Sequence, residues 1–411
     1  AGRSTVHDKI FELPAGHAAL FKNGALQVHR YWYPASGEFR NDLSLEDATD
    51  QLDSLICETM REWTISDVPV GALVSGGLDS TLVSYLSARD LDRLDMFTVF
   101  FPDHSAEVDE RHLAVLAAKA AQREHIEVPF YDNYIPGNLE RLIAHFDEPL
   151  QDTNSLTFMG LSEYIQQNSD VKAVITGEGS DEMFGGYQRH RIIADEYEKT
   201  GDPSVLMYAM NKVALPRLEL FAETTAFDNP ERLAIVENLI SKDAVGMGLE
   251  LDQICFLPGY LQRVDQIGMM FGLEMRPPLL DHRLVRFANA LPKRLRMHQE
   301  PDGHHWHKYL VRKVAERYMP DKIVWNREKY QFMIPAARML YDGPLRTMFL
   351  DLFTQDCELS SHYDIKGILK LLDMHRPITE GGDDHSNTLG RLLSMEIWLR
   401  ARKANPGGKL Y

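Results

Sequence analysis

Two short stretches combine glycines, hydroxyl groups and carboxylates in a way that suits the binding of an anion and a metal ion. The first is SGGLDS at residues 75–80, and the second is TGEGSDEMFGG at residues 176–186. Each follows an apolar run, so Asp79 and Asp181 lie a few residues past a predicted strand. Two carboxylates beside a glycine-rich turn suit a Mg²⁺ ion that carries a nucleotide triphosphate. The usual phosphate motif with a lysine is absent, because the only Gly-Lys pair, residues 408–409, is followed by leucine.

The first stretch has the properties of a pyrophosphate-binding loop. Backbone N–H groups between a strand and a helix, together with the positive end of that helix, favour an anion. Ser75 and Ser80 add hydroxyl donors, and Gly76 and Gly77 let the backbone approach a pyrophosphate closely. The alternative is a tight turn in which Asp79 only caps a helix, and the short motif alone leaves both interpretations open.

The elements that must position these loops alternate between strands and helices. Apolar runs predict four strands, with helical patterns between them, at residues 68–74, 96–101, 125–129 and 171–175. Such alternation builds a parallel sheet with helices on both faces, and its ligands lie at the carboxyl ends of the strands. From residue 192 onward the pattern is mostly helical, with no sustained strand pattern.

The N-terminal region predicts a β-hairpin, because Asn23-Gly24 separates two apolar-rich runs within residues 17–32. A lone hairpin is marginally stable in water, so this one must pack against something. A linker follows at residues 34–40, and Ser44 then begins a helix with capping-box spacing. We therefore expect three parts, at residues 1–40, 41–403 and 404–411.

Composition narrows the class of partner. The 411 residues carry 44 Lys plus Arg against 61 Asp plus Glu, a formal net charge of −17, which disfavours nucleic acid as a partner. No apolar run is long enough for a membrane span, and residues 1–30 lack the order of a secretory signal. The three cysteines are far apart in the sequence, which favours a reducing cytoplasm.

Five motifs together resemble one family. The chain is similar to the glutamine-dependent asparagine synthetases, whose synthetase domain has the HUP-like α/β fold of the PP-loop ATP pyrophosphatases. The similarity runs from about Leu45 to about Trp398. The motifs appear in the family's order: VSGGLDS (74–80), FDEPLQD (146–152), TGEGSDEMFGGYQRH (176–190), GLEMRPPLLDHRLV (272–285) and VWNREKYQF (324–332).

The resemblance implies a role for each matching position. The loop from Ser75 to Ser80 would bind the pyrophosphate of ATP, and Asp79 and Asp181 would hold Mg²⁺. Glu178 would serve the formation and use of an acyl-adenylate. Lys329 would stabilise charge near the α-phosphate, and Arg327 lies on the same loop. Backbone contacts to adenosine would come from Leu73, Val99, Thr176 and Gly177.

The expected reaction is amide formation. A carboxylate oxygen attacks the α-phosphorus of ATP, pyrophosphate leaves, and an amine then attacks the acyl carbon while a carboxylate such as Glu178 takes its proton. Aspartate and ammonia are the default substrates. One alternative uses the same chemistry on another carboxylate, in a cyclising enzyme of the β-lactam or peptide type. A second alternative is a catalytically silent scaffold. A third is a tRNA-modifying enzyme, which the net charge disfavours.

The resemblance also bears on the nitrogen source. Residues 1–35 look like the last hairpin of the family's N-terminal glutaminase domain, which needs an N-terminal cysteine. This chain begins with Ala1, and its first cysteine is Cys57. We therefore expect the glutaminase to be absent, truncated or on another chain, and a glutaminase-like partner to pack on residues 1–35.

Overall fold

The computed structural model describes most of the chain. The described residues are 5–34, 40–104, 111–150, 152–202, 205–206, 230–239, 241, 243–326, 334–354, 356–377 and 383–405. Among them, none of the helices combines the length and the apolar character that crossing a membrane requires.

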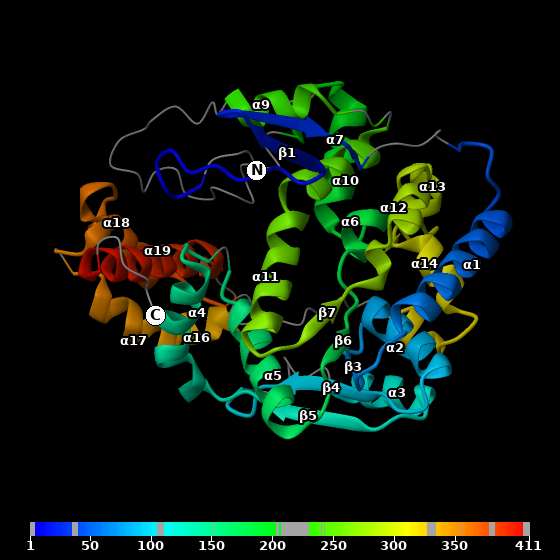
Figure 1. Cartoon of the computed structure of the whole chain (residues 1–411), viewed down its shortest axis with the longest axis horizontal. Helices are drawn as coiled ribbons and strands as arrows, with labels where there is room; N and C mark the ends of the chain where they lie inside the picture. Colours follow the sequence, from blue (N-terminus) through cyan, green and yellow to red (C-terminus); the bar gives the residue numbers. More distant parts are fainter. Residues whose placement is uncertain are drawn as a thin grey trace.

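The main sheet of the fold is parallel, as predicted, and has five strands (Figure 1). Its order is β5-β4-β3-β6-β7. The four predicted strands are present, and the prediction missed the fifth, because two of the three residues of β7 are charged and it lies in the half that looked helical. The bounds are β3 Val70–Leu73, β4 Asp95–Phe100, β5 His125–Pro129, β6 Ala173–Ile175 and β7 Glu274–Arg276.

Helices cover both faces of the sheet, because alternate strand residues enter two separate hydrophobic cores. Val70 and Ala72 enter one core, whereas Leu73 and Val174 enter the other. The first core is completed by helices that include α1 Leu45–Trp63, α2 Leu78–Asp90, α3 Arg111–Ala121, α12 His282–Asn289 and α14 Tyr309–Ala315. The second is completed by helices that include α4 Ile135–Phe146, α5 Ser155–Asn168, α11 Leu257–Met270 and α16–α19. Burial of these apolar side chains is the main force that holds the layers together.

The remainder is mostly helical, as predicted. Its further elements are α7 Gln188–Thr200, α9 Pro230–Glu237, α10 Ala244–Cys255, α13 Lys293–Arg296, α15 Asp321–Val324, α16 Ala336–Asp342, α17 Pro344–Leu352, α18 Ile365–Met374 and α19 Ser386–Ala404. A short antiparallel ribbon, β8 Met297–Gln299 and β9 His305–His307, is a second departure from the helical expectation. Helices α16–α19 gather at one end of the view, in orange to red (Figure 1).

The predicted N-terminal hairpin is present. Strand β1, His17–Lys22, pairs with β2, Ala25–Arg30, so that Lys22 faces Ala25 across the turn. Asn23 and Gly24 have φ angles of 52° and 77°, the two positive values of a type I′ turn. Figure 1 places this dark-blue hairpin at the opposite edge of the view from β4 and β5.

Candidate active site

The two glycine-rich loops leave neighbouring strands at the point where the order of the sheet reverses. From β3 the chain moves outward to β4 and β5, and then returns to place β6 on the other side of β3. Val70 pairs with Ala173 and Ala72 with Ile175, so the carboxyl ends of β3 and β6 lie side by side. Ligands of open α/β sheets bind in the crevice at such a point.

The loop after β3 is stabilised by hydrogen bonds between its own residues. The hydroxyl oxygens of Ser75 and Ser80 are 3.0 Å apart, and the backbone N–H of Ser75 donates to Ser80 Oγ at 3.2 Å. The N–H of Gly77 donates to Ser75 Oγ at 3.2 Å. Helix α2 then begins with no side-chain cap, and Asp79 lies in its first turn. The first N–H groups of this helix can therefore donate to an anionic ligand.

The glycines of this loop have different tasks. Gly76 has φ +79°, and a Cβ atom there would lie 2.4 Å from the Cβ of Leu113. Helix α3 therefore packs directly on Gly76, which needs glycine for packing as well as for its backbone conformation. A Cβ at Gly77 would meet only Ser75 Oγ, at 3.1 Å. Of the two, Gly77 is the position where the backbone is left open to a ligand.

The loop after β6 contacts the first turn of α2. A Cβ atom at Gly177 would lie 2.7 Å from the backbone nitrogen of Ser80, so the two loops are in backbone contact. Gly179 follows with φ +91°, and helix α6, Ser180–Phe184, then begins. Asp181 is in the first turn of α6, as Asp79 is in the first turn of α2. Both carboxylates consequently lie at helix N-termini that face one crevice.

One lysine joins the two carboxylates. The ammonium nitrogen of Lys308 lies 3.0 Å from Asp181 Oδ1 and forms an ion pair with Asp79 Oδ2. Burial alone would lower the pKa of Lys308, but the two carboxylates outweigh burial and raise it. Lys308 has φ +55°, a left-handed conformation that costs a residue with a Cβ atom roughly 1 kcal/mol. The fold therefore keeps a strained residue where its charge joins Asp79 to Asp181.

Glu178 lies among these charges and is partly buried. Desolvation raises its pKa most, and the nearby carboxylates of Asp181 and Asp79 raise it further, whereas Arg263 and Lys308 oppose the shift. Arg263, on α11, also pairs with Asp152 at 2.9 Å. Its positive charge thus lies beside Glu178 and links that side of the crevice to the FDEPLQD segment.

The carboxylate next to Asp181 is more deeply buried. Desolvation and the charge of Asp181 raise the pKa of Glu182 to about 7. The hydroxyl of Tyr187 donates to Glu182 Oε1 at 2.7 Å, and Gln253 Nε2 donates to the carbonyl of Glu182 at 3.1 Å. Glu182 therefore connects the loop to the helices behind it rather than facing the crevice.

The other predicted ATP-binding positions surround the same crevice. Leu73 ends β3, Val99 is close to the end of the adjacent strand β4, and Thr176 follows β6. The predicted residues Arg327 and Lys329 lie outside the residues that the structure describes. The structure thus brings together Leu73, Ser75, Gly76, Gly77, Asp79, Ser80, Val99, Thr176, Gly177, Glu178 and Asp181 around the ends of β3, β4 and β6.

Sequence reasoning missed three cations of the site. They are Lys308, Arg312, whose guanidinium is influenced by the charge of Asp79, and Arg263. Burial lowers the pKa of Arg312 to about 10, and its guanidinium lies over the Trp306 ring at 4.9 Å. Lys308 directly precedes helix α14 and Arg312 lies in its first turn, and two cations so close in the sequence are only a weak signal for a charged site.

The donor set fits a magnesium ion held jointly with a nucleotide. Asp79 Oδ1 is buried and has no hydrogen-bond partner among the described residues, so it is available to a cation. Within the described ranges, no three His, Cys, Asp or Glu side chains gather closely enough to hold a metal alone. Mg²⁺ commonly binds through one or two carboxylates together with substrate phosphates and water. Asp79 and Asp181 would be those carboxylates.

The sheet and its crevice place the protein in the class of open α/β proteins that bind ligands at a switch point. Residues 51–400 match the family model described as asparagine synthase, so the chain belongs to the asparagine synthase family.

The relatives are longer than this chain. It is 26% identical to a Mycobacterium bovis protein provisionally named a glutamine-hydrolyzing asparagine synthetase, over 96% of this chain and 64% of that protein. It is 25% identical to amidase chry2 of Gibberella zeae, over 86% of this chain and 62% of that protein. The chain thus spans less than two-thirds of either relative. An NH3-dependent NAD synthetase structure from Campylobacter jejuni matches 46% of this chain and 100% of its own, at 14% identity and a TM-score of 0.26, too weak a likeness for a functional argument.

Proposed function

We propose that this chain is an ATP-dependent, AMP-forming amide synthetase that joins a carboxylate to ammonia or an amine. Aspartate, giving asparagine, is the default substrate. The observation that carries the proposal is the ion-pair triad at the switch point, in which Lys308 contacts both Asp79 and Asp181. Two glycine-rich loops that share one charged centre suit a nucleotide triphosphate better than a structural turn.

The first step is adenylation. The uncapped first turn of α2 and the hydroxyls of Ser75 and Ser80 donate to the pyrophosphate part of ATP. Mg²⁺ on Asp79 and Asp181 would offset the negative charge of the phosphates. The carboxylate oxygen of the substrate attacks the α-phosphorus, the bond to pyrophosphate breaks, and a mixed anhydride with AMP forms. Lys308 and Arg312 supply positive charge beside this displacement, which reduces the repulsion between the anions.

The second step is attack by nitrogen. The lone pair of the amine adds to the acyl carbon, AMP leaves with the bonding electrons, and the amine loses one proton. Glu178 is the group that we assign to accept that proton. Burial raises the pKa of Glu178, which makes its carboxylate a stronger base than an exposed glutamate. Arg263 beside it limits that rise and helps to keep the carboxylate ionised.

Two further residues are assigned catalytic roles from the resemblance to the family. Lys329 would stabilise the negative charge at the α-phosphate as the pentacoordinate arrangement forms, and Arg327 would support it from the same loop. A positive charge placed where negative charge develops is the usual means of lowering such a barrier.

The nitrogen source is proposed to be free ammonia for the 411 residues alone. Cys357 is buried in the core, Cys255 packs with Ile193, and Cys57 Sγ lies 3.4 Å from the hydroxyl of Tyr318. None of these places a thiol beside the crevice. A glutaminase-like domain or chain would supply ammonia from glutamine, and the N-terminal hairpin is where we propose that it docks.

Exposed apolar side chains on this segment support the docking proposal. Leu20, Phe21 and Leu26 are 51%, 71% and 65% exposed. Because neighbouring residues of a strand point to opposite faces, Leu20 and Phe21 leave apolar surface on both sides of the ribbon. A two-stranded ribbon with both faces exposed lacks the packing that stabilises a sheet. A partner that covers it would provide that packing.

Two other readings remain candidates. A larger carboxylate or a cyclising reaction stays an alternative, and one relative is named an amidase, but Glu178 matches the glutamate of the asparagine synthetases and favours the asparagine type. A silent scaffold is disfavoured, because the acidic pair, Lys308 and Glu178 are all present in one crevice. The three free cysteines fit a reducing compartment, and we propose the cytoplasm.

The test is pyrophosphate release across a panel of carboxylates, with ATP, Mg²⁺ and ammonia, and with aspartate included. We expect release that depends on one carboxylate and yields AMP and an amide in equal amounts. Glutamine at matched concentration should not replace ammonia. Efficient use of glutamine would contradict the nitrogen assignment, and ADP in place of AMP would contradict the reaction class.

A further inference from the structure

The loop that carries Glu178 and Asp181 is covered by a leucine from a distant part of the chain. Gly179 lies between the two carboxylates with φ +91°. A Cβ atom at Gly179 would lie 2.2 Å from Leu280 Cδ2, so the Leu280 side chain packs directly on this backbone. The loop contains glycines at 177 and 179 and so has little intrinsic stiffness. Its shape must therefore come from what packs on it.

The same distant segment also holds the start of the loop. Ile175 pairs with Arg276 across β6 and β7, and the backbone N–H of Thr176 donates to the carbonyl of Arg276 at 2.9 Å. Residues 276–280 therefore contact the loop at two points, by a backbone hydrogen bond at Thr176 and by the Leu280 side chain at Gly179.

Residues 276–280 in turn contact the C-terminal end of helix α1. Arg276 Nη1 donates to the carbonyl oxygens of Trp63 and Ile65, each at 2.9 Å. The last carbonyls of a helix lack partners within the helix and attract a positive charge. Arg276, whose side chain is only 15% exposed, therefore ties β7 to the C-terminus of α1.

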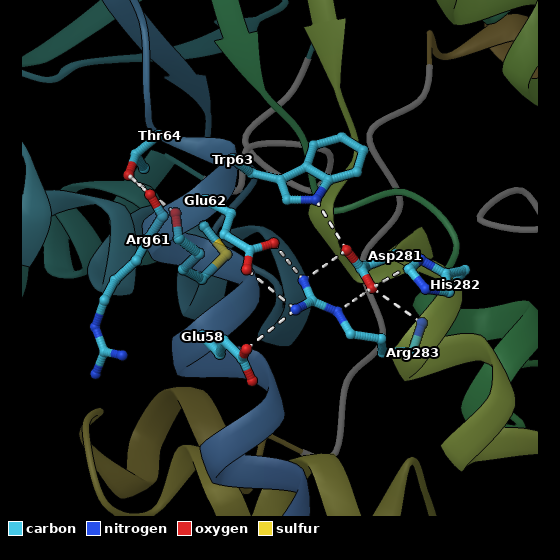
Figure 2. A network of polar contacts seen from close by, with 9 residues as sticks. Glu58, Arg61, Glu62, Trp63, Thr64, Asp281, His282 and Arg283 are labelled. Atoms are coloured by element: carbon cyan, nitrogen blue, oxygen red, sulfur yellow. Dashed lines mark hydrogen bonds and ion pairs between the residues drawn. The ribbon is translucent and has the colours of Figure 1, made fainter.

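A second set of contacts with α1 lies on the C-terminal side of Leu280. Trp63 Nε1 donates to Asp281 Oδ2 at 3.2 Å, and the backbone N–H and Nε of Arg283 both donate to Asp281 Oδ1 at 2.9 Å. Arg283 then reaches Glu62 Oε2 at 2.5 Å and Glu58 Oε1 at 3.2 Å on α1. Figure 2 shows these side chains converging from α1 and from the start of α12. Asp281 also caps α12, so this anchor fixes the direction in which the chain leaves Leu280.

We propose that residues 276–281 form a positioning element for Glu178 and Asp181, with Leu280 as the positioning residue and the end of α1 as its support. The proposal rests on the function proposed above, because it assigns the two carboxylates to catalysis. Leu280 does not reach the reacting atoms. It acts by restricting the backbone between the two carboxylates, and misplacement by about 1 Å of a catalytic group can cost a large factor in rate.

The experiment compares Leu280→Ala with Leu280→Met, which retains apolar volume over Gly179. For Leu280→Ala we expect kcat for pyrophosphate release to fall about ten-fold, with a smaller rise in KM for ATP, because loop 75–80 keeps its own contacts while Asp181, which would hold Mg²⁺ with ATP, lies on the affected loop. Hydrogen exchange of amides 177–181 should become faster in the same variant. Leu280→Met should keep both kcat and the rate of amide exchange close to those of the wild type. Trp63→Phe, which removes one donor to Asp281 and retains a smaller aromatic ring, should show a smaller change in the same direction.

The control is Leu291→Ala, at a core position outside residues 276–281. Leu291 is 1% exposed, so its truncation should lower the melting temperature more than Leu280→Ala while leaving kcat of the folded protein within about two-fold. Unchanged kcat and unchanged exchange in Leu280→Ala, or equal losses in the two alanine variants, would overturn the proposal. If the wild-type chain releases no pyrophosphate with any carboxylate, the proposed function fails. The exchange of amides 177–181 then still decides whether Leu280 restricts the loop.

Discussion

The two loops of the crevice reach a similar geometry by different means. Loop 75–80 is held largely by its own residues, through the hydroxyls of Ser75 and Ser80, with helix α3 packed on Gly76. In loop 176–181 the buried Thr176 and Ser180 hydroxyls have no hydrogen-bond partner among the described residues. This loop is shaped from outside, by the backbone of the first loop and by Leu280. A local motif can therefore describe the first loop almost completely, but only part of the second.

The difference has a functional consequence. Loop 75–80 contains the groups that we assign to pyrophosphate binding. A loop that is stabilised by its own hydrogen bonds suits this role, because ATP is bound in every catalytic cycle. Loop 176–181 carries Glu178, which acts on the acyl group and the amine. Its dependence on distant residues means that substitutions far from the crevice can change the chemistry more than they change ATP binding, to which this loop contributes Asp181.

The largest expected effect tests whether the two loops share one centre. Asp79→Asn and Asp181→Asn should each lower carboxylate-dependent pyrophosphate release by roughly a thousand-fold or more, because each removes a negative charge that would hold Mg²⁺. Release of pyrophosphate is measured together with the melting temperature. Asp90→Asn, at the other end of α2, is the matched control and should retain activity. A large loss in one aspartate variant with near-normal activity in the other would separate the two loops.

The next effect tests the charge that joins them. Lys308→Met should lower pyrophosphate release by roughly ten- to a hundred-fold, because positive charge is lost beside the displacement. Without ligand the variant should also melt at a lower temperature, since breaking a buried ion pair typically costs about 3–5 kcal/mol. Methionine also has a Cβ atom, so it meets the same backbone strain at φ +55° as lysine.

The response of the Lys308→Met variant to Mg²⁺ tests whether the ion binds between the two aspartates. Mg²⁺ with ATP should raise the melting temperature of Lys308→Met more than that of the wild type, because the ion replaces the missing positive charge between Asp79 and Asp181. Lys313→Met is the control, on helix α14 that follows Lys308, where Lys313 pairs with Glu316 at 2.5 Å on the partly exposed side. Equal responses of the two variants to Mg²⁺ with ATP would mean that the ion does not bind between the aspartates.

Features of the fold and the site that depend on residues close together in the chain were predictable from the sequence, whereas features that depend on distant residues were not. The parallel sheet, strands β3 to β6 and both loops were predictable, because apolar runs of the right length directly precede Ser75 and Thr176. Strand β7 was not, because two of its three residues are charged and give no apolar run, and it forms by pairing with β6. Lys308 and Arg263 were missed because they lie more than 80 residues from the loops along the chain, in elements typical of any helical domain. Arg327 and Lys329, which only the resemblance singles out, lie outside the described residues and stay predictions.

A smaller effect tests loop 75–80, which is stabilised by its own hydrogen bonds. Ser80→Ala removes the hydroxyl that contacts Ser75 twice, and a neutral hydrogen bond contributes about 0.5–1.5 kcal/mol. We expect KM for ATP to rise roughly three- to ten-fold with kcat nearly unchanged. Ser87→Ala is the control, because Ser87 lies on the same helix and, within the described part of the chain, its hydroxyl donates only to the carbonyl of Val83. A fall in kcat at constant KM would place Ser80 in the chemistry and remove the contrast between the loops.

The smallest expected effect concerns the outside support and depends on pH. Asp281 is 8% exposed, and although burial would raise its pKa, hydrogen bonds from Arg283 and Trp63 lower it to about 2. The folded protein thus binds the Asp281 proton more weakly than the unfolded chain, whose aspartates titrate near 3.9. The stabilisation from this carboxylate is therefore fully present above about pH 4 and is lost as the pH falls toward 2.

Asp281→Asn should accordingly be less stable than the wild type at pH 6, by at most about 2 kcal/mol, and the difference should shrink steadily between pH 4 and pH 3. Asparagine remains a good cap for α12, so the helix itself should persist and only the charge of the anchor is lost. The measurement is the free energy of unfolding in urea at several pH values. Asp67→Asn, on an exposed stretch just after α1, is the control and should show no such difference. A stability difference that stays constant from pH 6 to pH 3 would mean that the charge of Asp281 does not anchor the segment, and that the outside support of the second loop depends on Arg276 alone.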